Sequence, residues 1–73
     1  MDDPQRKEYL SMAQGRRKHL QDIVDRSHAA EAELLILEEY EEAAAQRRRT
    51  LEAMVALERV ELEIEHLCRI ATA

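Results

Sequence analysis

A repeat of apolar side chains runs through the C-terminal part of the chain and constrains its fold more than any other feature. Its members fall at alternating spacings of four and three residues, and they are Ala53, Leu57, Val60, Ile64, Leu67 and Ala71. Such a repeat predicts an α-helix whose apolar stripe packs against another helix as a coiled coil. With Ile64 at heptad position a and Leu67 at position d, the pattern favours a two-stranded assembly.

The composition favours helices in the rest of the chain as well. The 73 residues include one Gly, one Pro, no Phe and no Trp, so they offer few of the residues that turns and strands prefer. We therefore predict an all-α fold. We expect a helical hairpin of one shorter and one long helix, with a coiled-coil C-terminal half, that assembles into a dimeric helical bundle.

Capping signals and apolar stripes predict the helix limits within a single all-helical domain, residues 1–73. A first helix is expected at about 4–25, a turn at about 26–28, and a long helix at about 28–71. An unbroken helix through the turn is the alternative, because apolar residues continue at helical spacing there. The stripes before and after residues 46–50 differ in phase, so a skip or a break, with Thr50 as N-cap, is expected there.

Net charge and apolar runs limit the classes of partner. The formal charge of −5 argues against general nucleic-acid binding, because phosphate contacts need a basic surface. No apolar run approaches the roughly 20 residues that span a bilayer, and no apolar N-terminal stretch resembles a signal peptide. Because the chain also has a single cysteine, Cys68, we expect a soluble, cytoplasmic protein.

Catalytic and metal-binding motifs give little support to an enzyme. No nucleophile lies in a recognisable motif, and one glycine cannot form a phosphate-binding loop, so we predict no catalytic residue and no cofactor. Glu63 and His66 have the Glu-x-x-His spacing of di-metal carboxylate bundles, but the coiled-coil register places His66 on the solvent side. We therefore assign no metal ligand, and a di-metal carboxylate bundle stays a second alternative.

Three groups of residues are the candidate interaction sites. The predicted interaction seam consists of Leu34, Leu37, Tyr40, Ala53, Leu57, Val60, Ile64 and Leu67. The predicted acidic face consists of Glu38, Glu39, Glu41 and Glu42, and the basic cluster of Arg47, Arg48 and Arg49. Tyr40 is the best candidate for an interface anchor, because tyrosine combines apolar area with a hydrogen-bonding tip. The arginines are expected to pair with the glutamates.

These features together predict a non-enzymatic protein–protein interaction module, such as a small adaptor, assembly factor or chaperone-like subunit. One amphipathic helix cannot bury the seam alone, so we expect the seam to meet a second copy, in a homodimer, or a helix of a partner protein. The alternative is an acidic inhibitor or regulator, of the kind that phages encode, that blocks a basic surface on its partner. No membrane partner is expected, and nucleic acid is disfavoured.

Overall fold

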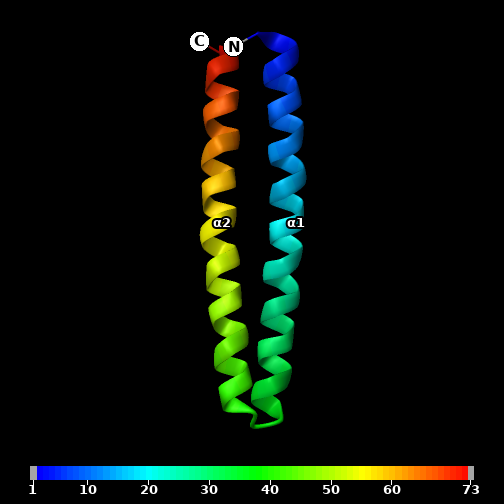
Figure 1. The fold of residues 1–73 in the computed structure, drawn as a ribbon, viewed down its shortest axis with the longest axis vertical. Helices are drawn as coiled ribbons and strands as arrows, with labels where there is room; N and C mark the ends of the chain where they lie inside the picture. Colours follow the sequence, from blue (N-terminus) through cyan, green and yellow to red (C-terminus); the bar gives the residue numbers. More distant parts are fainter. Residues whose placement is uncertain (1, 73) are drawn as a thin grey trace.

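Two antiparallel helices of nearly equal length form a hairpin (Figure 1). The computed structural model describes residues 2–72, with side chains described for residues 2–70. Helix α1 spans Asp3–Ile36 and α2 spans Tyr40–Thr72. The predicted all-α hairpin is confirmed, since 94% of the structure is helical and its described part contains no strand. A rise of 1.5 Å per residue gives α1 a length of about 51 Å, which matches the 53 Å long dimension of the molecule.

The start of α1 follows from its first residues. Asp2 is extended and forms the N-cap, and its carboxylate Oδ1 accepts a hydrogen bond from the backbone N–H of Gln5 at 3.5 Å. Pro4 lies in the first turn, where a helix has no internal partner for a backbone N–H. The sequence therefore specifies this end of the helix locally.

The turn predicted at 26–28 is wrong, and so are the limits of 4–25 and 28–71 that depended on it. Helix α1 continues through this region to Ile36. Ser27 is only 6% exposed because it lies in the interface between the helices and does not cap a new one. Arg26 is paired with Asp22, one turn earlier, at 2.6 Å. The alternative of an unbroken helix is therefore the observed one.

The chain reverses direction at 37–39, without a glycine or a proline. Glu38 has a φ of 59°, in the left-handed region that non-glycine residues rarely adopt. The backbone N–H of Glu38 donates to the carbonyl of Leu35 at 3.1 Å, and that of Glu39 donates to the carbonyl of Leu34 at 2.9 Å. These two bonds are the Schellman arrangement that ends helices. The turn therefore makes the two helices nearly equal, where one short and one long helix were predicted.

The skip or break predicted at 46–50 is also absent, because α2 passes through it unbroken. Thr50 is 2% exposed, and its hydroxyl donates to the carbonyl of Gln46 at 3.1 Å, which is the bond of a threonine inside a helix. One continuous stripe faces α1 at alternating spacings of three and four. Its members are Ala43, Gln46, Thr50, Ala53, Leu57, Val60, Ile64 and Leu67.

The core lies along the seam between the two helices and is built largely from small side chains. Ala13 is fully buried against Val60 and Ile64, and Leu10 and Leu20 pack around this cluster. The buried apolar residues of the described chain are Ala13, Val24, Ala43, Ala53, Val60, Ile64 and Leu67. Since three of the seven are alanines, the backbones can approach closely, but little apolar area is removed from water.

Candidate protein-interaction surface

Most of the predicted interaction seam is already occupied within the chain. Ala53, Val60, Ile64 and Leu67 are buried, and Leu34 and Leu57 are half-buried. Leu10, Ala13 and Leu20 of α1 contact the Val60 and Ile64 region. The expectation that a second chain must cover these positions is therefore wrong, because the misplaced turn had left α1 too short to reach them. Any surface for a partner lies on the outer faces of the hairpin.

Leu37, Tyr40 and the predicted acidic face lie together at the tip of the hairpin. Ile36 is 81% exposed and Tyr40 is 63% exposed, and Leu35 and Leu37 are about half exposed. The four glutamates Glu38, Glu39, Glu41 and Glu42 are all exposed around them. The tip thus combines apolar side chains with strong negative charge. It is a protruding end rather than the flat helix face that the sequence suggested.

Two carboxyl groups at the start of α2 influence each other. The backbone carbonyl of Glu39 accepts from the N–H of Ala43 at 2.9 Å, so Glu39 is the N-cap of α2 and Glu42 lies three residues further on. A hydrogen bond to Glu42, together with charge repulsion from it, raises the pKa of Glu39 above its usual value. Glu39 therefore keeps a proton to higher pH than an isolated glutamate does.

The outer side of α2 carries an apolar patch that the sequence analysis did not single out. We call Leu51, Met54, Val55 and Leu62 the α2 outer patch; all four are exposed, from 43% to 60%. Beside it lies a groove of about 600 Å³ whose floor includes Val24 and Leu57. The spacings of four and seven from Leu51 to Val55 and Leu62 put these side chains on one side of a helix. The same spacing can be read directly from the sequence.

A second apolar groove, of about 750 Å³, lies along α1 near the open end of the hairpin. It is lined by Tyr9, Met12, Gly15, Arg16, His19, Leu20 and Glu63. Arg16 Nη2 donates to both carboxylate oxygens of Glu63, at 3.0 and 2.9 Å, and so ties α1 to α2 at its edge. Both groups are about half exposed, so this pair contributes roughly 0–1 kcal/mol.

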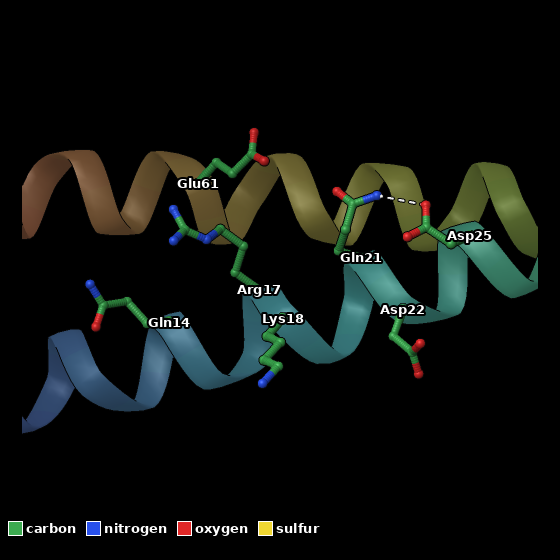
Figure 2. Close-up of a pocket in the computed structure, with 7 residues that line it drawn as sticks. All are labelled: Gln14, Arg17, Lys18, Gln21, Asp22, Asp25 and Glu61. Carbon is green, nitrogen blue, oxygen red and sulfur yellow. Dashed lines mark hydrogen bonds between the residues drawn. The ribbon is translucent and has the colours of Figure 1, made fainter.

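A polar cleft of about 830 Å³ lies on the same side of the hairpin as the groove beside the α2 outer patch, and the two share Gln21 and Glu61. Figure 2 shows Arg17 reaching from α1 toward Glu61 of α2, while Gln21 Nε2 donates to Asp25 Oδ1 at 3.1 Å. The cleft is open and carries both charge signs. It offers no enclosed space in which a small substrate would be shielded from water.

The predicted basic cluster divides among several contacts. Arg47 Nε lies 4.0 Å from a carboxylate oxygen of Glu31, and Arg49 donates to the side chain of Gln46 at 3.4 Å. Arg48 is exposed. The predicted pairing of the arginines with the glutamate block thus occurs at one of the three positions in the structure.

The structure engages Glu63, one of the two residues considered as metal ligands, in an ion pair. Both oxygens of Glu63 accept from Arg16, so metal binding there would first have to break that ion pair. His66 and Cys68 are exposed. Among the described residues, no three His, Cys, Asp or Glu side chains gather as a metal site would require.

The fold defines the class of the protein as an antiparallel two-helix hairpin with apolar outer surfaces. No family model, no curated protein and no solved structure matches the chain. Neither of the described helices contains a stretch long and apolar enough to cross a membrane.

Proposed function

We propose that this chain is a non-enzymatic protein–protein interaction module, a small adaptor or assembly factor, that packs its outer helix surfaces against helices of a protein partner. The observation that carries the proposal is the set of exposed large apolar residues that remain after the internal seam has been filled. They are Tyr9, Met12, Leu35, Ile36, Leu37, Tyr40, Leu51, Met54, Val55 and Leu62. An exposed apolar patch, such as the α2 outer patch among these residues, marks an interaction site in soluble proteins.

The exposed area of the hairpin supports the same proposal. A compact monomer of 8.5 kDa exposes about 4,650 Å², whereas the hairpin exposes 5708 Å². The excess of about 1,050 Å² is comparable with the roughly 800 Å² that each partner buries in a standard interface. Packing against a partner would bring the surface of the hairpin to that of a compact protein. We place this activity in the cytoplasm, where the exposed thiol of Cys68 stays reduced.

Photo-crosslinking in the cells that make the protein tests the proposal directly. A photoreactive residue at Leu51 or Leu62 should give a crosslinked product of discrete mass, because these side chains would be covered by the partner. The matched control is the same photoreactive residue at Arg49, an exposed position almost opposite Leu51 on α2. Equal yields from both sides of the helix, or no discrete product from any position, would refute an interaction module.

A second candidate function is an acidic inhibitor or regulator that presents the hairpin tip to a basic surface. Residues 31–44 carry six glutamates and no Lys or Arg, and the structure gathers the last four of them around exposed Ile36 and Tyr40. Binding through this end should weaken steeply with salt. Reversal of Glu38, Glu41 and Glu42 to lysine should abolish it, and unchanged binding would eliminate this candidate.

A further inference from the structure

The side of α2 that carries the α2 outer patch also separates charge along its length. Toward the hairpin tip this side carries Arg47 and Arg48, and toward the open end it carries Glu58, Glu61 and Glu65, with Arg59 at its flank. The apolar residues Leu51, Met54 and Val55 lie between the two charged ends. A surface with positive charge at one end, apolar residues in the middle and negative charge at the other is complementary to itself when one copy is reversed.

The register of an antiparallel pair follows from this pattern. When two α2 helices lie antiparallel with the two-fold axis beside Leu51 and Met54, Leu51 of one copy lies opposite Met54 and Val55 of the other. In the same register, Arg47 and Arg48 lie opposite Glu58 of the second copy. Leu62 then meets the small side chain of Ala44. Every large residue of the patch has an apolar counterpart, and the Arg47 and Arg48 end of each copy meets Glu58 of the other.

We propose that a second copy of this chain occupies the α2 outer patch, with the two α2 helices antiparallel and the two hairpins forming a four-helix bundle. This inference rests on the proposed interaction function and specifies its partner. The overlap would extend from about residue 40 to about residue 65, or about 39 Å of helix. The groove of about 600 Å³ beside the patch would receive Met54 of the second copy, since methionine adapts to irregular spaces.

The area available is sufficient for such a dimer. Each copy exposes about 1,050 Å² more than a compact monomer of its mass, and a standard interface takes about 800 Å² from each partner. A two-fold interface also uses each contact twice. One favourable Arg48 and Glu58 pairing therefore occurs at both ends of the bundle.

A charge exchange tests both the partner and the register. The variants Arg48→Glu and Glu58→Arg each place like charges opposite each other at both ends of the dimer. We expect sedimentation equilibrium to show a dimer for the unmodified chain, and a dissociation constant at least about tenfold higher for each variant alone. When the two variants are mixed, opposite charges face each other again at both ends, so a dimer of one variant with the other should form at close to the original affinity.

The matched control reverses charge on the other side of the same helix. Arg49→Glu alters an exposed residue that lies two positions before Leu51 and so almost opposite it on the helix. This variant should leave the dimer unchanged, and circular dichroism should show the same helicity for all variants. An unmodified chain that is monomeric at about 100 µM protein, well above a dissociation constant of about 1 µM, would overturn the inference. So would a mixture that fails to restore the dimer, or a control variant that weakens it equally. If crosslinking at Leu51 still gave a product heavier or lighter than two chains of 8.5 kDa, the interaction function would stand with another protein as its partner.

Discussion

Replacing Glu38 by glycine should stabilise the hairpin, although it removes a side chain. At a φ of 59°, the Cβ of a non-glycine residue crowds the following carbonyl, which costs about 1–2 kcal/mol. Glycine has no such contact, but its greater freedom in the unfolded chain offsets roughly 0.5–1 kcal/mol of the gain. We therefore expect Glu38→Gly to raise the free energy of unfolding by about 0.5–1 kcal/mol.

Thermal unfolding followed by circular dichroism at 222 nm, the standard helix wavelength, is a suitable assay. For a domain of about 60–100 residues, 1 kcal/mol corresponds to about 4–8 °C, so the midpoint should rise by about 2–8 °C. The control is Glu38→Gln, which removes the charge but keeps the Cβ. This variant should raise the midpoint only by the amount that comes from removing the charge repulsion with Glu39, Glu41 and Glu42.

The backbone argument would be refuted in two ways. If Glu38→Gln raised the midpoint as much as Glu38→Gly, charge repulsion would account for the whole effect. If Glu38→Gly lowered the midpoint, the Schellman bonds from Glu38 and Glu39 to α1 would not be the feature that ends the helix.

Three further predictions follow from single positions. Gly15→Ala should stabilise the chain by about 1 kcal/mol, because a Cβ at Gly15 would meet nothing within 4 Å; a lower midpoint in thermal unfolding would contradict this. Ile64→Ala should cost about 2–5 kcal/mol in urea unfolding, whereas His66→Ala on the exposed side should change stability by less than about 0.5 kcal/mol. The raised pKa of Glu39 means that the folded chain binds this proton more tightly than the unfolded chain, so its contribution to stability is present at low pH and is lost as the pH rises through the raised pKa. Glu39→Gln should therefore be more stable than the unmodified chain at pH 7 and equal to it in acid; a difference independent of pH would contradict the coupling to Glu42.

The helices could be predicted from the sequence because their signals are local, whereas the turn between them could not. Asp2 and Pro4 mark the start of α1 by capping and by a fixed φ, and α2 has a regular repeat. The turn is set by Glu38 in a left-handed conformation, which glutamate adopts only when the surrounding structure requires it. That requirement comes from the packing of the two helices against each other, not from the local sequence. A hairpin buries the most seam when its two helices match in length, and this fixes the turn near the middle of the chain.

The phase shift predicted at 46–50 does not occur because the seam contains polar as well as apolar residues. The stripe that faces α1 includes the polar residues Gln46 and Thr50. It also includes Ala43, and alanine is so common in helices that it does not indicate which side is buried. Large apolar residues alone therefore do not trace this stripe, and a pattern built on them would wrongly join Leu51 and Val55 to it. The same error concealed the α2 outer patch, because Leu51 and Val55 belong to an outer surface of their own.

The composition of the seam connects the stability of the hairpin with its proposed interaction. A buried Val, Leu or Ile side chain contributes up to about 1.5–3 kcal/mol, and the described seam buries only four of them, Val24, Val60, Ile64 and Leu67. Ordering the backbone costs conformational entropy at every residue, and the small seam residues Ala13, Ser27 and Thr50 return little of that cost. A hairpin with so thin a core gains most from covering its remaining large apolar side chains. Folding and association through the α2 outer patch would then be coupled. The charges that determine which partner binds would also determine what fraction of the chain is folded.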